Sequence, residues 1–530
     1  MIIRLTLISL IALAGCLIWI TPPVVQSQAV RRELTLQEKR GKAFYLRGES
    51  ASGQEITALM GDVDVPASTL TCAGCHGARG EGKTEGGVTA GNLGWTHLTK
   101  PYGHTHDNSR KHGAFAESSF VRAMTSGVDP AGNKLAVAMP TYRMPQEDMA
   151  NLIAYLKRIE SDNDPGLTDN TIVVGTILPE KSAMTGMAQS MGEVLQAYFA
   201  EINNRGGIYN RKIELHVMNG DSKATVSNAK QLIDNDQVFA IVGGLTAGAE
   251  DGVATLMQEK EVPFIGPSAL LPQRGLPVNR YIFYLLPGLK EQARALTLFA
   301  GKKPGAAKSH VAILAPDVDF NRGIASAIEE QAKKLKWQSV TTMYYTHEGY
   351  SAARLVNEMH QKDIDTIFFL GSGPEAAALL SEAETVGWEA PIYMLGSLLG
   401  RSIADAVTPK MKDKVFLAFP TVPADVTATG AAEYTGLLKR NKIQPAHSAA
   451  QASAIAAARI LVHALERCGK DLSRERLITT LEGLYEYDTG LMPKITFGPN
   501  RRIGALGAYV VTIDPEKKLF PASTEWVSVE

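Results

Sequence analysis

Residues 72–76 read Cys72-Ala73-Gly74-Cys75-His76, the C-x-x-C-H pattern of covalent c-type haem attachment. Two thiols three positions apart lie one helical turn apart, so they can add to the two vinyl groups of one haem. The histidine that follows can supply the axial nitrogen that haem iron needs. The pattern therefore predicts one covalently bound haem c, with Cys72 and Cys75 as thioether positions and His76 as the proximal iron ligand.

Other interpretations of this stretch are weaker. Cys16 and Cys468 stand alone, which excludes a disulfide framework. A zinc site would need two more ligands at fixed spacing. Nearby histidines are available (His97, His104, His106 and His112), but there is no second cysteine pair. Residues 77–84 satisfy the P-loop pattern but lack the preceding strand and following helix that it requires. Their glycines are expected instead to let the backbone pass close to the porphyrin edge.

The sixth iron ligand is expected downstream of the motif. Met139 lies in a loop before a helix expected over residues 146–159, and its thioether is a soft, neutral ligand that raises the haem potential. Met144 is the second choice, and a histidine from the His104–His112 cluster is the third.

The N-terminus carries an export signal. The single positive charge of Arg4 precedes an apolar run from Leu5 to Ile20, which two prolines end. Residues 27–29 read Ser-Gln-Ala, the small-x-small pattern of a signal-peptidase site. Residues 1–29 are predicted to be a cleaved signal peptide, with a membrane anchor or lipidation at Cys16 as alternatives. Each alternative places the chain in the periplasm or on the outer face of the cytoplasmic membrane.

The remaining chain divides at a polar linker, residues 161–170, which is rich in aspartate and contains proline and glycine. Residues 34–160 contain short loops between helices expected over residues 36–46 and 146–159. Residues 171–530 alternate apolar strands with amphipathic helices, which predicts two α/β lobes whose parallel sheets are covered on both faces. The predicted strands cover residues 172–178, 213–218, 239–243, 263–266, 281–286, 311–315, 340–345, 366–370, 392–395 and 415–419.

Composition and motifs exclude some functions. Lys plus Arg (54) balances Asp plus Glu (55) in this chain of 530 residues, so the basic surplus of a nucleic-acid-binding protein is absent. The sequence has no nucleophile elbow, dinucleotide fingerprint or metal-hydrolase motif. A methionine-ligated haem also leaves no open iron position for substrate. An electron carrier and ligand-binding protein is therefore favoured over an enzyme.

Residues 35–160 resemble a class I cytochrome c domain. The resemblance rests on C-A-G-C-H-G, on Gly41, Phe44 and Tyr45 in the opening helix, and on the run from Gly127 to Tyr142 that contains Met139. It implies an all-α domain whose terminal helices cross, with the Gly41 region against Leu152 and Tyr155. An insertion around Tyr102–His112 departs from the family and leaves open whether a histidine replaces Met139.

Residues 171–530 resemble the type I periplasmic solute-binding proteins of the leucine/isoleucine/valine-binding kind. The run Glu201-Ile202-Asn203, then Gly206-Gly207-Ile208 and Arg211-Lys212-Ile213-Glu214-Leu215, carries the resemblance, together with the turns at 242–248 and 262–269. It implies two Rossmann-like lobes joined by a hinge, with a small-molecule ligand between them at the carboxyl ends of the strands.

The resemblance also suggests ligand-binding positions. In amino-acid binders, small hydroxyl residues after the third strand accept the ligand carboxylate, and an acidic residue in the second lobe pairs with its ammonium group. Here Leu270 stands where threonine is usual, and the acidic position falls near Ser397. A zwitterion needs partners for both charges, so these departures predict a less polar ligand. The candidate positions are Thr246, Ala247, Gly248, Ser268, Ala269, Leu270, Phe320, Ser372 and Ser397.

The sequence therefore predicts an exported electron-transfer cytochrome fused to a domain that binds a small solute other than an amino acid. Its partners would be that solute and an exported cytochrome or dehydrogenase. The alternative is a substrate-binding receptor of a transporter, for an amino acid or related solute, with an accessory cytochrome.

Overall fold

The computed structural model describes residues 34–530 apart from residues 86, 107–108, 163, 181–183, 247, 401–402, 519–523 and 530. The predicted export segment, residues 1–29, and the ligand-binding candidate Ala247 lie outside the described residues. The chain divides into two compact units. The first contains the residues up to Thr71 and Trp95–Arg158, and the second contains Cys72–Gly94 and the residues from Ile159 onward.

The helices of the first unit include the two expected at its ends. The first begins after Thr35, whose hydroxyl accepts the Glu38 N–H while the Glu38 carboxylate accepts the Thr35 N–H, a capping box. It ends at Gly48, which has the left-handed conformation that favours glycine. The helices are α1 (Leu36–Arg47), α3 (Trp95–Leu98), α4 (Glu117–Ser126) and α5 (Gln146–Leu156), with the 3-10 turn η1 (Ala67–Thr69).

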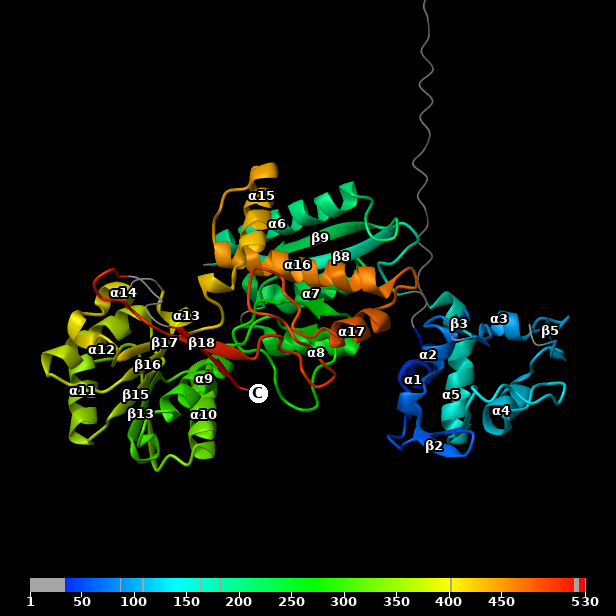
Figure 1. Cartoon of the computed structure of the whole chain (residues 1–530), viewed down its shortest axis with the longest axis horizontal. Helices are drawn as coiled ribbons and strands as arrows, with labels where there is room; N and C mark the ends of the chain where they lie inside the picture. The colour runs from blue at the N-terminus through cyan, green and yellow to red at the C-terminus, as the bar shows by residue number, and fades with distance from the viewer. Residues whose placement is uncertain are drawn as a thin grey trace, which may run out of the picture. The chain divides into compact units, whose positions relative to one another are not determined.

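The terminal helices α1 and α5 pack side by side and approach most closely at Gly41 (Figure 1). A Cβ atom at Gly41 would lie 2.0 Å from the Asn151 carbonyl oxygen and 2.8 Å from Tyr155 Cβ. Only a residue without a side chain allows this approach. The buried rings of Tyr45 and Tyr155 lie 5.7 Å apart beside it. The packing confirms the crossing that the resemblance to cytochrome c implies.

The first unit also contains short strands that the sequence did not reveal. A three-stranded antiparallel sheet has the order β2-β1-β7, and a separate hairpin pairs β5 with β6. The Tyr142 hydroxyl, in the middle of β7, donates to the Leu70 carbonyl at 2.7 Å and so ties the loop after Met139 to the chain just before Cys72. The strands are β1 (Thr57–Met60), β2 (Val63–Pro66), β5 (His104–Thr105), β6 (Lys111–His112) and β7 (Thr141–Arg143).

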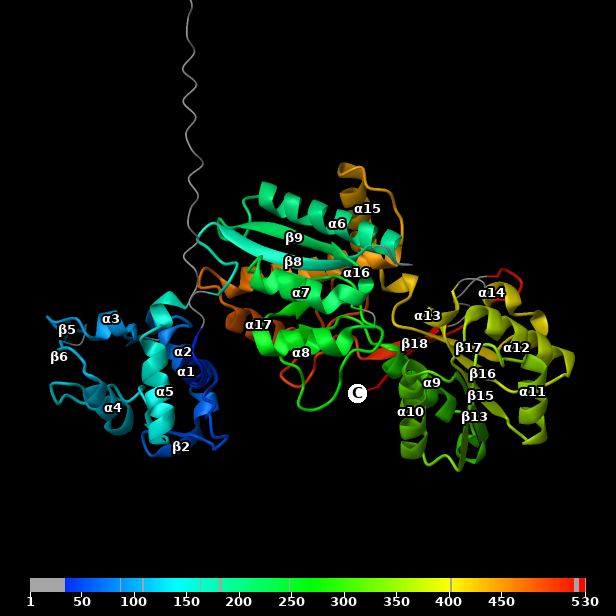
Figure 2. The ribbon, with the colours of Figure 1, turned by 180° about the vertical axis from the view of Figure 1, so that it is seen from behind.

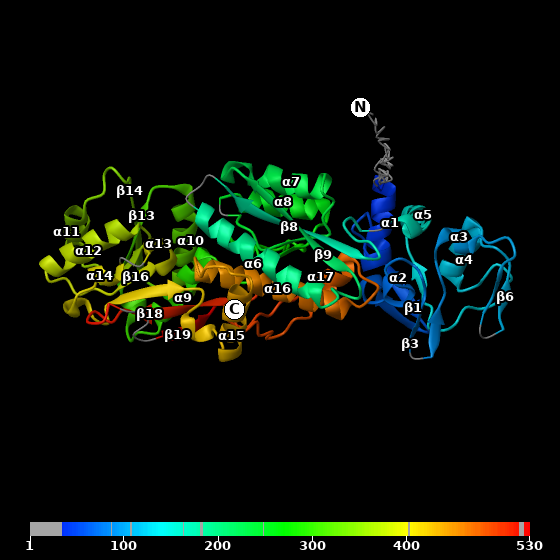
Figure 3. The same cartoon turned by 90° about the horizontal axis from the view of Figure 1, so that it is seen from above.

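The second unit begins with the haem-motif segment and then forms two lobes. In the first lobe the parallel sheet has the order β12-β11-β10-β8-β9. Helices α7 and α8 lie on one side of β8, and α6 and α16 on the other (Figure 3). The elements are β8 (Thr171–Pro179), α6 (Thr185–Asn204), β9 (Lys212–Gly220), η3 (Ser222–Ala224), α7 (Thr225–Asp234), β10 (Ala240–Val242), α8 (Glu250–Lys260), β11 (Phe264–Ile265), β12 (Ile282–Phe283), α15 (Ala428–Arg440), α16 (Ser448–Cys468) and α17 (Arg474–Glu482).

In the second lobe the sheet has the order β14-β13-β15-β16-β17-β18-β19, with α9 and α10 on one face and α11 and α12 on the other (Figure 2). Strands β13–β17 are parallel, whereas β18 and β19 are antiparallel additions. The elements are α9 (Leu289–Gly301), η4 (Ala306–Lys308), β13 (His310–Pro316), α10 (Asp319–Lys334), β14 (Ser339–Tyr345), α11 (Ala352–Gln361), β15 (Thr366–Phe369), α12 (Gly373–Thr385), β16 (Ile392–Leu395), α13 (Gly396–Leu399), α14 (Ile403–Ala406), η5 (Pro409–Met411), β17 (Val415–Phe419), η6 (Pro423–Asp425), β18 (Gly507–Thr512) and β19 (Thr524–Ser528).

These two lobes confirm the predicted α/β architecture, and the ten strands expected from the sequence correspond to β8–β17. Within the described residues, α16 is the helix whose length and hydropathy would suit a membrane span. Its apolar side chains, among them Ile455, Ile460 and Leu461, are fully buried in the core of the first lobe. That burial is the property of a core helix in a globular domain.

The segment expected to be a polar linker is partly bound to the second unit. The Asp164 carboxylate accepts the Arg474 N–H at 2.7 Å, and the Gly166 carbonyl accepts the Val173 N–H at 2.7 Å. The Arg211 guanidinium donates to the Thr168 carbonyl at 2.8 Å. Residues 164–170 therefore extend the first lobe instead of forming a free tether.

The Gly41 contact makes a prediction about stability. Gly41→Ala should destabilise the first unit by about 1–3 kcal/mol, because its methyl group must push α1 away from the Asn151 carbonyl. Scanning calorimetry of the full-length protein should show a transition several degrees lower. Gly113→Ala is the matched control, since a Cβ atom there meets open space. An unchanged transition in Gly41→Ala would contradict the close packing of α1 and α5.

Candidate functional site

The haem motif forms a short helix, α2 (Cys72–His76), at the start of the second unit. Cys72 is buried, Cys75 is exposed, and neither is in a disulfide. The two thiols are separated by one helical turn, as the spacing predicted.

The His76 ring is held in the form that can bind iron. Its Nδ1 lies 2.7 Å from the Gly91 carbonyl oxygen, which can only accept, so Nδ1 carries the proton and Nε2 keeps its lone pair. Burial lowers the pKa of His76, and the Gly91 hydrogen bond opposes this only in part. The ring is therefore neutral at pH 7. A backbone carbonyl on the second ring nitrogen is the usual partner of a metal-ligating histidine.

The glycine-rich segment after His76 forms a tight loop. The Gly82 N–H donates to the His76 carbonyl at 2.8 Å, and the Leu93 N–H donates to the Gly80 carbonyl at 2.7 Å. Lys83 and Thr84 lie in β3 (Lys83–Glu85), which pairs with β4 (Val88–Ala90). A P-loop would place these two residues at the start of a helix, so the structure agrees with excluding one.

The two methionine candidates lie in the first unit. Met139 is half-buried in a bend, where its N–H donates to the Ala136 carbonyl at 2.8 Å. Met144 is half-buried between β7 and α5. The histidines named as the third choice, His104, His106 and His112, lie on the β5–β6 hairpin of the same unit. The choice among these ligands for the iron of His76 stays a prediction.

The ligand-binding candidates of the first lobe lie in the loops that follow β10 and β11. Thr246 is buried, and its N–H and hydroxyl both donate to the Ser268 carbonyl, at 3.1 and 3.3 Å. Ser268 and Gly248 are exposed, and Ala269 is half-buried. Leu270 exposes 38% of its surface, so an apolar side chain is presented to solvent beside the loop ends.

Glu250, the first residue of α8, joins these two loops, and the sequence analysis missed it. Its carboxylate accepts the N–H groups of Gly248 at 2.8 Å, Leu270 at 2.9 Å and Leu271 at 3.4 Å. These are backbone donors of the loops that, by the resemblance, would receive a ligand carboxylate. An internal carboxylate therefore already occupies them, and a second negative charge there would be repelled.

In the second lobe the candidates lie after β13, β15 and β16. Phe320 is half-buried in the first turn of α10 and packs partly against the core. The Ser372 hydroxyl and N–H both donate to Glu375 Oε2 at 2.8 Å. Ser397 is exposed on α13.

Glu375 is a second acidic residue that the sequence analysis missed. Its Oε1 lies 2.8 Å from His347 Nδ1, and the Tyr345 hydroxyl donates to its Oε2 at 3.3 Å. Burial acts to raise the pKa of Glu375, but the hydrogen bonds from Ser372 and His347 outweigh it and lower that pKa. The carboxylate is thus ionised and already partnered. The S-x-x-E spacing of Ser372 and Glu375, a capping box, is the signal that could have found it.

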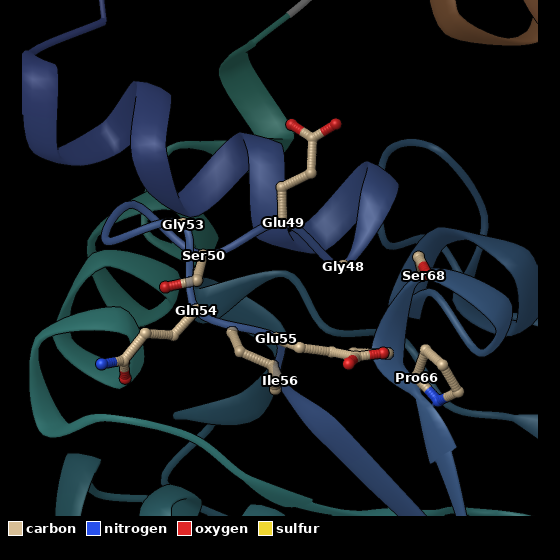
Figure 4. A pocket seen from close by; sticks show the side chains of 10 residues that line it. Gly48, Glu49, Ser50, Gly53, Gln54, Glu55, Ile56, Pro66 and Ser68 are labelled. Atoms are coloured by element: carbon tan, nitrogen blue, oxygen red, sulfur yellow. The ribbon is translucent and has the colours of Figure 1, made fainter.

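Two surface pockets lie apart from these residues. One, of 240 Å³, lies in the first unit around Glu49, Glu55 and Pro66, where the Glu55 side chain reaches toward Pro66 (Figure 4). The other, of 550 Å³, lies in the second unit and is lined by basic side chains that include Arg294 and Lys334. None of the predicted haem-binding or ligand-binding residues lines either pocket.

Comparison with known families matches both parts of the chain. The model of the periplasmic binding protein family matches residues 171–518, and the model of the cytochrome c family matches residues 65–160. The Leu/Ile/Val-binding protein BraC3 of Rhizobium johnstonii is 23% identical over 332 residues, 62% of this chain and 87% of that protein. The Leu/Ile/Val-binding protein homolog 8 of Brucella abortus is 23% identical over 255 residues, 46% of this chain. The chain spans 62% of the length of that homolog.

Solved structures share the fold of the second unit. A fatty acid ABC transporter substrate-binding protein from Thermomonospora curvata superposes with a TM-score of 0.52 at 21% identity, covering 69% of this chain and 94% of that one. A branched-chain amino acid ABC transporter protein from Thermus thermophilus with bound valine gives 0.51 at 16% identity, covering 69% and 96%. At these identities the likeness shows the fold.

Proposed function

The chain belongs to the periplasmic binding protein family and carries a cytochrome c domain, and from these two parts we propose that it is an exported electron-transfer protein whose second unit binds a small solute other than an amino acid. Both families are generally exported to the periplasm, which supports the export signal predicted at residues 1–29. The redox partner would be another exported cytochrome or a dehydrogenase.

A cytochrome c domain implies covalently bound haem, and the residues of α2 fit that group. Cys72 and Cys75 would form the two thioethers, and His76 would supply the proximal nitrogen. The observation that carries this assignment is the His76–Gly91 hydrogen bond, because it orients the ring and leaves Nε2 unprotonated. When bound, haem supplies a one-electron redox centre. Met139, with Met144 as second choice, would hold the sixth position.

The ligand proposal depends on Glu250. The relatives are named for fatty acids and for leucine, isoleucine and valine, all of which are carboxylic acids. In this chain the Glu250 carboxylate holds the N–H groups of Gly248 and Leu270. A ligand carboxylate would have to displace it and leave a half-buried charge without partners, which costs several kcal/mol. With Leu270 exposed beside this position, the preferred solute would be uncharged and partly apolar.

Covalent attachment of haem can be tested by extraction. Haem should remain with the polypeptide after acid–organic extraction, in a ratio of one per chain, because both Cys72 and Cys75 are thioether positions. Cys75→Ala should leave at most one thioether and sharply reduce the yield of haem-loaded protein. Cys468→Ala, a buried cysteine outside the motif, is the control and should keep its haem. Haem that extracts freely from the unmodified protein would contradict the assignment.

The sixth ligand can be identified by spectroscopy. The oxidised protein should show the weak far-red absorption band of sulfur bound to ferric haem. Met139→His should abolish the band and lower the reduction potential, because a nitrogen ligand replaces the thioether. Met144→Ala should keep the band. If Met139→Ala keeps the band and Met144→Ala removes it, Met144 is the ligand.

Calorimetry on the full-length protein should detect no binding of leucine, isoleucine or valine. Micromolar affinity for any of them, about −8 kcal/mol, would contradict the ligand proposal. Glu250→Ala should bind isovalerate more tightly than the unmodified protein does, since it frees the Gly248 and Leu270 donors. Glu259→Ala, an exposed position on the same helix, is the matched control and should not change isovalerate binding.

A further inference from the structure

Three histidines gather on the β5–β6 hairpin of the first unit, in the insertion that departs from the cytochrome c pattern. His104 and His112 are paired across the hairpin, and His106 follows β5. The ring centroids of His104 and His112, and those of His106 and His112, are both 5.1 Å apart. His112 is buried and the other two are half-buried, so the rings are partly removed from water.

Hydrogen bonds assign the protons of these rings. His112 Nδ1 lies 2.7 Å from the Gly113 carbonyl oxygen, so Nδ1 carries the proton and Nε2 has a lone pair. The His104 ring interacts with the backbone carbonyls of Leu98 and His97. Its Nε2 is buried and has no hydrogen-bond partner among the described residues. A buried ring nitrogen without a partner carries a desolvation cost that a ligand would remove.

The His106 and His112 rings bring their two Nε2 atoms close together. Their Nε2 atoms are 2.9 Å apart, which would require a proton between them. The Arg110 guanidinium, however, donates to the same His106 Nε2 at 3.1 Å, so that atom acts as an acceptor. In the neutral form of His112, with its proton on Nδ1, the two Nε2 lone pairs point at each other. A cation between them would convert this repulsion into two bonds.

The surroundings of His104 and His106 favour the neutral form of these two rings. Burial lowers the pKa of His104 and of His106, and the neighbouring positive groups Arg110 and Lys100 lower these values further. Neutral imidazole is the form that binds metal. The charge of Arg110 is itself balanced by Asp129, whose fully buried carboxylate lies 2.7 Å from it. The fourth histidine nearby, His97, makes another contact: Lys100 Nζ donates to its Nδ1 at 3.0 Å.

From this arrangement we propose that His104, His106 and His112 bind one divalent transition-metal ion, zinc or copper, through their Nε2 atoms and separately from the haem iron. Imidazole suits both ions, and three histidines leave a fourth position for water or another ligand. A metal bound at about 2.1 Å places two ring centroids roughly 5 Å apart, which two of the three pairs already show.

In the structure the three rings are not yet close enough together to surround one ion. Among the described residues, no three histidine, cysteine or carboxylate side chains already surround a common point. The His104 and His106 centroids are 6.4 Å apart, so this pair must close by roughly 1 Å on binding. Both residues belong to a hairpin whose strands are two residues long, and such a short hairpin can make this adjustment.

Metal analysis of the full-length, haem-loaded protein tests the proposal. After treatment with EDTA, the protein is equilibrated with Zn²⁺ or with Cu²⁺ and analysed for zinc, copper and iron. One zinc or copper ion per chain is expected in addition to the haem iron. His104→Gln and His106→Gln should each weaken binding by at least about tenfold. His360→Gln, an exposed histidine on α11, is the matched control and should bind like the unmodified protein.

Haem absorption and circular dichroism report whether each variant is folded. His112 is buried, so His106→Gln, at a half-buried position, carries the test if a substitution at His112 does not fold. Nitrogen hyperfine coupling from three imidazoles in the Cu²⁺ spectrum would support the site directly. Equal ion binding by the unmodified protein and the variants would overturn the proposal. So would variants that change the haem spectrum while leaving zinc and copper binding intact, because the histidines would then act on the haem.

Discussion

Parallel strands place all their carboxyl ends at one edge of a sheet, and this constraint brings together the loops that hold the candidate ligand-binding residues of the second unit. The loops after β10 and β11 meet at that edge in the first lobe, and those after β13, β15 and β16 meet there in the second. Their backbone N–H groups need partners, because buried or half-buried donors are costly when left unpaired. Glu250 in one lobe and Glu375 in the other supply carboxylates for this purpose.

The two carboxylates have a functional consequence. A binding protein for amino acids needs free donors for the ligand carboxylate and a free acid for its ammonium group. Here the donors after β10 and β11 are held by Glu250, and Glu375 is already bonded to Ser372 and His347. The fold of the family is retained, with these two carboxylates bonded at the strand ends. Fold alone therefore does not carry the ligand over from the relatives.

The framework of the first unit is fixed by two contacts. Gly41 lets α1 and α5 approach closely, and Tyr142 ties β7 to Leu70, two residues before Cys72. The β5–β6 hairpin lies outside this framework. It contributes few apolar side chains and gathers ring nitrogens whose hydrogen bonds are incomplete. Such unsatisfied groups are a mark of a binding site more than of a stabilising contact.

The sequence by itself determined the haem motif and strands β8–β17, because fixed spacing and apolar periodicity encode them locally, whereas the crossing at Gly41 followed from the resemblance to cytochrome c. It missed β18, which begins at Gly507, and β19, where Val527 alone is buried and no alternation marks a strand. Only the tertiary structure decided that Glu250 also holds the Leu270 N–H, twenty residues away, and that Glu375 meets His347, 28 residues away. The ring proton of His76 was likewise decided by the Gly91 carbonyl, fifteen residues away, which only folding brings near.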